Sequence, residues 1–517
     1  MNWILFIIVS IFISFVVKLV LFPLRSGPYK LPPGPTAFPI LTNFIWLRQS
    51  PLALESVLRS FMAKYGPIIT IHVGPSPAIV IADRSIVHKA LVQNGAIFAD
   101  RPRALSINRI TASGNLDNIT SAPYSPTWRL LRRNLAGVML HPSRVRGYSR
   151  VRKRVLDILI TRLESRPGSE TLVVQHFQFA TFCLLALMCF GDELNETQIL
   201  EIQQVQREII VNLQRFLILN FWPKLMKILL RKRWKEYLQL KNKQHEVLIP
   251  IIKAREKVKH EITKEGEEKE ENLVSYVDTL IDLQLIDQKR KLNNEEIVNL
   301  CSEFLNAGTD TTTTTLQWIM ANLVKNPPIQ QKLFEEIDVI MKSSTTQHEL
   351  REEEVKEEDL GKLPYLKAVI LEGLRRHPPG HFILPHAVKE DTTLENYFIP
   401  KNGTVNIMSG EMGWDPEVWE DPMTFKPERF MSGDGEVSST MFDITGSKEI
   451  KMMPFGVGRR ICPGYGLAML HLEYFVANLV WRFEWKAVEG DEVDLSEKME
   501  FTIWMKNPLK AQLRPRF

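Results

Sequence analysis

Cysteine is scarce in this sequence: four residues in 517, at positions 183, 189, 301 and 462. No pair has the C-x-x-C spacing and the number is small, which excludes a disulfide-stabilised secreted scaffold and a structural zinc site. An excess of one charge is also missing, because 65 Lys and Arg stand against 60 Asp and Glu. This balance predicts no nucleic-acid partner. No G-x-G-x-x-G fingerprint follows a predicted strand, which excludes the usual kind of nucleotide-binding domain.

The N-terminus carries a long apolar run. Trp3 to Phe22 contains a single charge, Lys18, and neither Pro nor Gly. A helix of this length spans the ~30 Å hydrocarbon core of a bilayer. No basic residue precedes the run and no small-x-small cleavage site follows it, so it is typical of a retained anchor rather than a cleaved signal peptide. Because Arg25 and Lys30 follow it, the positive-inside rule predicts that the body of the protein is cytosolic.

The rest of the chain divides into a proline-rich stretch and one body. Residues 23–40 contain the sequence LPPGP, and since proline stiffens a spacer we expect a hinge there. In the body, residues 41–517, Gly66 to Ala82 and Ile383 to Gly410 have the alternation and the turn residues of short antiparallel strands. The patterns after Ser125 are mostly helical. The predicted fold is mainly α with a small antiparallel β portion.

One of the four cysteines, Cys462, lies in an unusual loop. Gly456 and Gly458 precede it, Pro463 and Gly464 follow it, and the residues after that predict a buried helix. Backbone N–H groups and a helix N-terminus beside a thiol lower its pKa and favour metal binding as a thiolate. Without such a setting, a lone cysteine is more often a small buried apolar residue.

The ten residues from Phe455 to Gly464 resemble the haem-binding loop of the cytochrome P450 family, F-x-x-G-x-R-x-C-x-G, at every fixed position. The resemblance implies that Cys462 is the axial ligand of the iron of haem b, that Arg460 pairs with a haem propionate, and that Phe455 packs near the sulfur. A cysteine thiolate in this position donates electron density to the iron and favours O–O cleavage. The resemblance also implies the P450 fold, with a single catalytic domain behind the N-terminal transmembrane helix.

A long helix is predicted from Asn294, as its cap, to Lys325, just before two prolines. Residues 307–311, with the sequence AGTDT, suit a helix poorly, because Gly costs about 1 kcal/mol relative to Ala and Thr is mildly unfavourable. A local rule broken inside an otherwise good helix indicates function. The alternative is a Gly- and Thr-rich helix packed closely against a neighbour. We expect Thr312 to Thr315 to pack, with hydroxyls bonded to the carbonyl four residues earlier.

The same stretch resembles the family's oxygen-activating motif, A/G-G-x-D/E-T-T/S, in full. The resemblance implies that Asp310 relays protons from solvent and that the Thr311 hydroxyl holds dioxygen or a water molecule. Ala307 and Gly308 would leave room for the diatomic ligand.

Trp128 and Arg132 are four residues apart and therefore share one face of the helix that Ser125 and Pro126 begin. An indole N–H and a guanidinium fork suit the two carboxylates of haem. On its own the W-x-x-x-R pattern is more typical of an ordinary surface pair. Its place in the chain is similar to that of the family's propionate-binding pair, and His386 stands where relatives carry an Arg or His with this role.

Glu372 and Arg375 form an E-x-x-R pair, and Arg429 lies in a later P-E-R-F segment. On a surface such a pair contributes only a few tenths of a kcal/mol. The resemblance implies a buried charge triad of Glu372, Arg375 and Arg429 that holds the cysteine loop in place. This role is structural rather than catalytic.

By position in the family, the substrate pocket draws on Phe304, Ala307, Phe382, Ile383 and Ile503. These side chains are apolar, which suits a hydrophobic small molecule. They do not choose among classes of hydrophobic substrate.

The resemblance therefore implies a haem-thiolate monooxygenase that inserts one oxygen atom of O2 into such a substrate. Electrons would come from NADPH through a separate cytochrome P450 reductase, since the chain has no flavin-sized segment. The enzyme would be held in the endoplasmic reticulum membrane by a single helix, 3–22, with its catalytic domain in the cytosol. Within the family, the cysteine loop and the hinge are similar to those of the plant A-type group, and the stretches from Lys367 to Gly380 and from Lys451 to Tyr474 are similar to the plant family numbered eighty-nine.

Two alternatives stay open. The same thiolate serves enzymes that rearrange or dehydrate peroxides without a reductase, but such enzymes usually lack the acid–Thr pair, and Asp310 and Thr311 are present here. A haem sensor or an inactive tethered binding protein would have no need of these two residues.

Overall fold

The computed structural model describes residues 10, 14, 30–35, 51–73, 76–102, 118–164, 171–191, 194–220, 223–265, 273–285, 289–344, 354–432, 442–490 and 492–517. Contacts between residues divide the chain into two compact units, each built from three stretches of sequence. We call them the strand-rich unit (Met1–Pro102, Phe382–Met412 and Thr445–Arg460) and the helical unit (Arg103–His381, Gly413–Ile444 and Ile461–Phe517).

The strand-rich unit is built on a four-stranded sheet. In spatial order its strands are β1 (Ile68–Val73), β2 (Ser76–Ile81), β9 (Thr404–Ile407) and β6 (His386–Ala387). The pairing of β2 with β9 is parallel and the other two are antiparallel, so both predicted strand regions are confirmed. Alternate residues of a strand face opposite sides. Accordingly Ile79 and Ile81 join one apolar cluster while Ala78 and Val80 join another, and both faces of the sheet are covered.

Short elements surround this sheet. They are α3 (Pro51–Tyr65), α4 (Arg84–His88), the hairpin of β7 (Thr392–Leu394) and β8 (Tyr397–Ile399), and α16 (Ser409–Gly413), whose last residue belongs to the helical unit. Leu58 of α3 is buried in the cluster that contains Val80. This packing follows from the apolar face that α3 carries.

The described part of the predicted hinge, residues 30–35, lies against the sheet. The N–H of Thr70 donates to the carbonyl of Pro33 at 2.8 Å, and the N–H of Phe398 donates to the carbonyl of Lys30 at 2.9 Å. A Cβ on Gly34 would lie 2.0 Å from the carbonyl oxygen of Thr70, so only glycine fits there. These residues are therefore docked. The predicted anchor, 3–22, lies outside the described residues except for Ser10 and Ser14.

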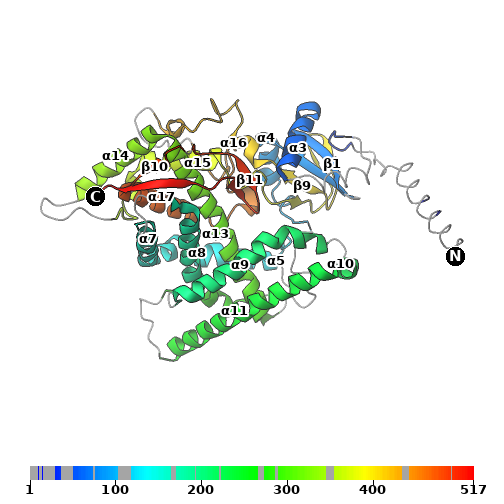
Figure 1. The fold of residues 1–517 in the computed structure, drawn as a ribbon. Helices are drawn as coiled ribbons and strands as arrows, with labels where there is room; N and C mark the ends of the chain where they lie inside the picture. The colour runs from blue at the N-terminus through cyan, green and yellow to red at the C-terminus, as the bar shows by residue number, and fades with distance from the viewer. Residues whose placement is uncertain are drawn as a thin grey trace. The chain divides into compact units, whose positions relative to one another are not determined.

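The helical unit surrounds one long central helix, α13 (Asn294–Lys325), labelled in Figure 1. Its contacts include α8, α9, α11, α14, α15 and α17. The helices of this unit are α5 (Pro126–Arg133), α6 (Pro142–Gly147), α7 (Ser149–Glu164), α8 (Val173–Phe190), α9 (Glu196–Leu217), α10 (Pro223–Leu229), α11 (Arg231–Glu265), α12 (Tyr276–Ile281), α13, α14 (Pro327–Ser344), α15 (Pro364–Arg376) and α17 (Tyr465–Arg482).

The start of α13 differs by one residue from the prediction. Asn293, not Asn294, is the cap: its side chain accepts the N–H of Glu296, and the Glu296 carboxylate accepts the N–H of Asn293 in return. This reciprocal arrangement satisfies two of the donors that every helix start leaves open. The end at Lys325 is as predicted.

The strands of the helical unit are short. They are β3 (Thr171–Leu172), β10 (Phe483–Ala487) and β13 (Lys510–Pro515) in one sheet, the hairpin of β11 (Glu497–Met499) with β12 (Ile503–Met505), and the pair β4 (Gln284–Leu285) with β5 (Arg290–Lys291). Among the described residues, α8 is the one helix with the length and apolar composition to cross a membrane. Since 83% of it is buried inside the protein, its composition is that of a core helix.

Candidate active site

Cys462 lies in the helical unit, three residues before α17, and its residue is half-buried. Burial raises the pKa of its thiol, whereas the N–H of Gly464 and the nearby Arg132 guanidinium lower it. The net direction is upward, so the lowered pKa expected from the sequence is wrong for the free thiol, because desolvation outweighs both partners. A metal ion that binds such a sulfur deprotonates it outright. The donors around the sulfur thus fit a thiolate ligand.

Arg132 and Trp128 lie on α5, whose start is confirmed: Ser125 accepts the N–H of Trp128 at 3.1 Å, and Pro126 is the first helical residue. Arg132 donates a hydrogen bond from Nη2 to the carbonyl of Ile461, the residue directly before the cysteine. The indole Nε1 of Trp128 donates to the carbonyl of Ile119 at 3.0 Å. Arg132 is therefore at the cysteine loop, whereas the single N–H of Trp128 is bonded to a neighbouring segment.

The remaining predicted cofactor residues lie in the strand-rich unit. Arg460 donates from Nε to the carbonyl of Ala99 at 2.8 Å, and His386 lies with Nδ1 2.6 Å from the carbonyl of Phe98. Arg101, which the sequence did not single out, donates to the carbonyls of Leu384 and Pro385, both at 2.8 Å.

The two guanidiniums disfavour each other's charge and keep the imidazole of His386 neutral. Burial lowers the pKa of His386 to about 3, with further lowering by Arg101 and Arg460. Burial likewise lowers the pKa of Arg101 to about 9, helped by Arg460 and opposed by Asp100. Two guanidiniums and an imidazole gathered in this way fit an anionic group such as a carboxylate.

The loop before the cysteine depends on glycine. Gly456 and Gly458 have φ of +67° and +69°, a backbone region that side chains disfavour. A Cβ on Gly458 would also lie 2.1 Å from the carbonyl oxygen of Leu91. Phe455, just before them, is half-buried.

Thr311 lies on the face of α13 that is open to solvent. Its hydroxyl donates to the carbonyl of Ala307 at 2.7 Å, and Ala307 is exposed although it lies in the middle of the helix. From Thr312 to Val324 every residue of α13 is buried. The open stretch around Ala307 thus leaves space beside a core helix, as a bound group would require.

The structure supports one expectation about this stretch and corrects another. A Cβ on Gly308 would lie 2.7 Å from Cδ1 of Leu185 on α8, so this glycine packs closely against a neighbouring helix, which is the alternative given for this motif. The Thr315 hydroxyl bonds to the carbonyl four residues earlier as expected, but the Thr314 hydroxyl donates to Ile503 at 2.7 Å. A strand that packs on α13 offers this hydroxyl a better partner than its own helix.

Asp310 is buried and takes part in an ion-pair network that the sequence did not predict. Arg207 of α9 lies 3.2 Å from Asp310 and also 3.2 Å from Glu500, which follows β11. Burial raises the pKa of Asp310 to about 6, against the lowering effect of Arg207. Its Oδ2 atom has no hydrogen-bond partner among the described residues.

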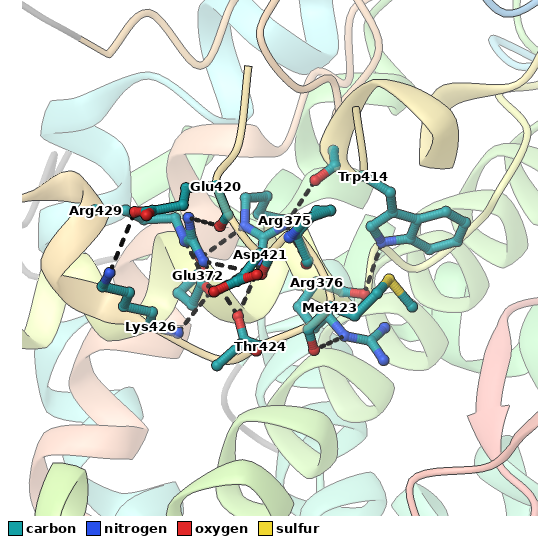
Figure 2. Close-up of polar contacts among 12 residues, drawn as sticks. Glu372, Arg375, Arg376, Trp414, Glu420, Asp421, Met423, Thr424, Lys426 and Arg429 are labelled. Carbon is teal, nitrogen blue, oxygen red and sulfur yellow. Dashed lines mark hydrogen bonds and ion pairs between the residues drawn. The ribbon is translucent and has the colours of Figure 1, made fainter. Parts of the chain in front are cut away.

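The three predicted structural residues come together in the helical unit, as Figure 2 shows. Arg375 donates to Glu372 from Nε at 2.7 Å and from Nη2 at 2.8 Å, and Arg429 donates from Nε at 3.2 Å. Arg375 also donates to the carbonyls of Gly413 and Pro422 at 2.6 and 2.7 Å. Glu372 and Arg375 are fully buried, so the triad ties α15 to the segment that contains Arg429.

The predicted pocket residues differ in accessibility. Phe304 is buried against Tyr276 with 5.1 Å between ring centres, and Ile503 is buried on β12. In the strand-rich unit, Phe382 and Ile383 are partly buried against the two apolar clusters of the sheet. Ala307 is exposed.

The backbone of Ile503 is held from two sides. Its carbonyl accepts the Thr314 hydroxyl and also the Nε1 hydrogen of Trp318 at 2.9 Å, while its N–H donates to the carbonyl of Pro379 at 2.9 Å. Trp318 stacks on His377 with ring centres 4.1 Å apart. The hairpin of β11 and β12 is thereby fixed to α13 and to the chain after α15.

Comparisons with known proteins agree with this arrangement. The family model "Cytochrome P450" matches residues 32–514. The chain is 50% identical to cytochrome P450 89A9 of Arabidopsis thaliana, across 99% of this chain and 98% of the relative. It is 30% identical to the flavonoid 3'-monooxygenase of the same plant, across 95% and 93% of the two chains.

A solved zebra fish cytochrome P450 with progesterone has the same fold, with a TM-score of 0.70 and 22% identity over 91% of this chain and all of that chain. The family's enzymes are haem-thiolate monooxygenases, and their standard cofactor is haem b. The chain belongs to the cytochrome P450 family, and it is similar to the plant members numbered eighty-nine.

Proposed function

We propose that this enzyme inserts one oxygen atom of O2 into a hydrophobic small molecule, with electrons passed from NADPH by a separate cytochrome P450 reductase. The observation that carries the proposal is the setting of Cys462, between the N–H of Gly464 and the Arg132 guanidinium. Haem b would supply the iron at which dioxygen is activated, and Cys462 would hold this iron as a thiolate.

Binding of the two haem carboxylates is assigned to the donor side chains described above. In the helical unit Arg132 is the donor, with Trp128 able to take part only if its indole leaves the carbonyl of Ile119. In the strand-rich unit Arg460 and His386 are joined by Arg101, because an anion would relieve the mutual repulsion of these groups. Phe455 is assigned to packing near the sulfur. The triad of Glu372, Arg375 and Arg429 is assigned a structural role.

Proton delivery is assigned to Asp310 and Thr311. A carboxyl whose pKa is about 6 takes up and releases a proton near neutral pH, as a relay requires. The Thr311 hydroxyl lies on the open face of α13, where it holds a water molecule or the oxygen ligand. Substrate contacts are assigned to Phe304, Ala307, Phe382, Ile383 and Ile503.

The N-terminal run, 3–22, is assigned as the anchor in the endoplasmic reticulum membrane. Residues 23–40 are assigned as the hinge, and residues 41–517 as the catalytic domain in the cytosol. One surface of the helical unit supports a membrane partner. On α10, Leu225, Ile228 and Leu229 are 48%, 75% and 64% exposed, beside the basic Lys227. Apolar side chains that are this exposed next to a cation suit a lipid interface.

The carbon monoxide difference spectrum of the reduced protein tests the proposal. A Soret band at about 450 nm is expected from thiolate ligation. Cys462→Ala should abolish this band, whereas Cys183→Ala, which removes a buried thiol of α8, should keep it. A band at about 420 nm in folded wild-type protein would contradict the proposal and favour a sensor or an inactive binding protein.

A further inference from the structure

Glu497, the first residue of β11, has its carboxylate beside two buried imidazoles. Its Oε1 atom lies 3.7 Å from Nδ1 of His377, and its Oε2 atom lies 3.3 Å from Nε2 of His381. The side chains of the two histidines are 0% and 3% exposed, and that of Glu497 is 21% exposed. The two rings, which come from the chain just after α15, thus face different oxygens of one carboxylate.

The charge states of these groups indicate what the carboxylate offers. Burial would raise the pKa of Glu497, but the two histidines lower it to about 2, so the group is ionised at neutral pH. Burial lowers the pKa of His377 to about 4, so its ring is neutral and has one N–H. A buried N–H needs an acceptor. At 3.7 Å the Glu497 oxygen is just outside hydrogen-bond distance, so a small approach of β11 would complete the bond.

Both imidazole rings are fixed by aromatic neighbours. His377 stacks on Trp318 of α13, and His381 lies edge-on to Trp414 with 4.7 Å between ring centres. Trp414 in turn donates its indole N–H to the carbonyl of the last residue of α15 at 3.1 Å, as Figure 2 shows. The two rings therefore form a fixed support for Glu497.

The hairpin of β11 and β12 is thereby attached through both of its strands. On β12 the backbone of Ile503 is held by α13 and by the carbonyl of Pro379. On β11 the contact is made by Glu497, whose cross-strand partner is Met505. A strand pair attached at one point can tilt about that point, and an attachment on the other strand fixes the tilt. Residues 377–381 provide both attachments.

We propose that Glu497 is a positioning residue whose carboxylate, held against His377 and His381, sets the tilt of the hairpin and so the place of the Ile503 side chain. The inference rests on the proposed function, which assigns Ile503 to substrate contact. A leucine at position 497 would offer no acceptor to either ring, and a buried donor without an acceptor is costly. An ordinary exposed ion pair would contribute less than about 1 kcal/mol and would not act through Ile503.

The test uses full-length haem-loaded protein and two probes that bind the ferric iron, imidazole and the larger 4-phenylimidazole. Glu497→Gln keeps one acceptor oxygen and Glu497→Leu keeps none, and each is made both in the wild-type chain and together with Ile503→Ala. Glu484→Gln, which removes a surface ion pair with Lys486 on β10, is the control. Probe affinity is read from the Soret shift, and hydrogen–deuterium exchange is measured for the peptides that contain β11 and β12.

For Glu497→Leu we expect faster exchange in β11 and β12 and a change of about tenfold in the dissociation constant of 4-phenylimidazole. The dissociation constant of the smaller imidazole should stay within about twofold. Together with Ile503→Ala, the same substitution should change the value for 4-phenylimidazole by less than about twofold, because the side chain through which Glu497 acts is gone. Glu497→Gln should fall between wild type and Glu497→Leu, and Glu484→Gln should match wild type.

Three results would each overturn the proposal: unchanged exchange in β11 and β12, an unchanged dissociation constant for 4-phenylimidazole, or an equal change with and without the Ile503 side chain. If Glu497→Leu does not fold, Glu497→Gln decides by the same readouts. Failure of the proposed function appears separately, as a wild-type carbon monoxide spectrum without the thiolate band. Exchange in β12 then decides about Glu497, since faster exchange supports its positioning role and unchanged exchange overturns it.

Discussion

Arg207 and Asp310 form an ion pair across α9 and α13, with 3.2 Å between Nη1 and Oδ1. The Arg207 side chain is 36% exposed and the Asp310 side chain only 4%. The pair therefore links a buried carboxyl group to a cation that solvent reaches, and the same cation reaches Glu500. A movement of α9 would change the charge environment of Asp310 directly.

Asp310→Asn should make the protein more stable at alkaline pH. Burial raises the folded-state pKa from 3.8 to about 6, so Asp310 costs stability that is lost as pH rises from about 4 to about 6 and stays lost above it. We expect a gain of roughly 2 kcal/mol at pH 8 that disappears as pH falls toward 4, measured by urea unfolding. Asp494→Asn is the control: Ser496 lowers the pKa of that exposed carboxyl, so the sign should reverse. A loss of stability in Asp310→Asn at pH 8 would show that its bond to Arg207 outweighs burial.

Thr311→Ala should separate electron consumption from product formation. The variant lacks the hydroxyl on the open face of α13, so proton delivery to dioxygen would no longer keep pace with electron delivery. We expect product to fall by about 10²-fold while NADPH is still consumed and hydrogen peroxide is released. Thr311→Ser keeps the hydroxyl and should stay coupled. Full coupling in Thr311→Ala would remove this residue from the proton path.

Arg375→Ala should destabilise the protein more than Arg429→Ala. Without Arg375, Glu372 is left as a fully buried charge whose remaining partners are Arg429 at 3.2 Å and the backbone N–H of Lys426 at 2.8 Å, and breaking such a pair costs about 3–5 kcal/mol. Without Arg429, both oxygens of Glu372 keep their bonds to Arg375. Chemical unfolding of the two variants, with the yield of haem-loaded protein, checks the order. Equal losses would mean that the triad acts as one unit.

Gly458→Ala should prevent the cysteine loop from forming its present conformation. The added Cβ would meet both a φ of +69° and the carbonyl of Leu91 at 2.1 Å. We expect a loss of more than about 2 kcal/mol and little haem-loaded protein. Gly361→Ala is the matched control, since nothing lies within 4 Å of a Cβ there. Normal haem content in Gly458→Ala would show that the loop accommodates a side chain.

Features of the site that depend on neighbouring residues could be predicted from the sequence. Ser125 and Pro126 predicted the start of α5, because a helix cap depends on adjacent residues. The ion pair of Glu372 and Arg375 was predicted because the two residues are three apart on one helix. The contacts of Arg207 and Trp318 could not be predicted, because Asp310 is 103 residues from the first and Ile503 is 185 residues from the second. No local pattern records such a pairing.

The prediction that needed correction failed for a related reason. Thr314 was expected to bond within its own helix, whereas its hydroxyl donates to the carbonyl of Ile503. A motif shows that a residue is unusual in its helix. It does not show which neighbour makes it so.

The hydrogen bonds at Ile503 have a consequence for protein engineering. Thr314 and Trp318 both bond to the backbone carbonyl of this residue, and Pro379 bonds to its N–H. None of these bonds involves the isoleucine side chain, so all three persist when that side chain is replaced. A library that varies position 503 would therefore exchange one buried side chain while the backbone at that position keeps its own hydrogen bonds.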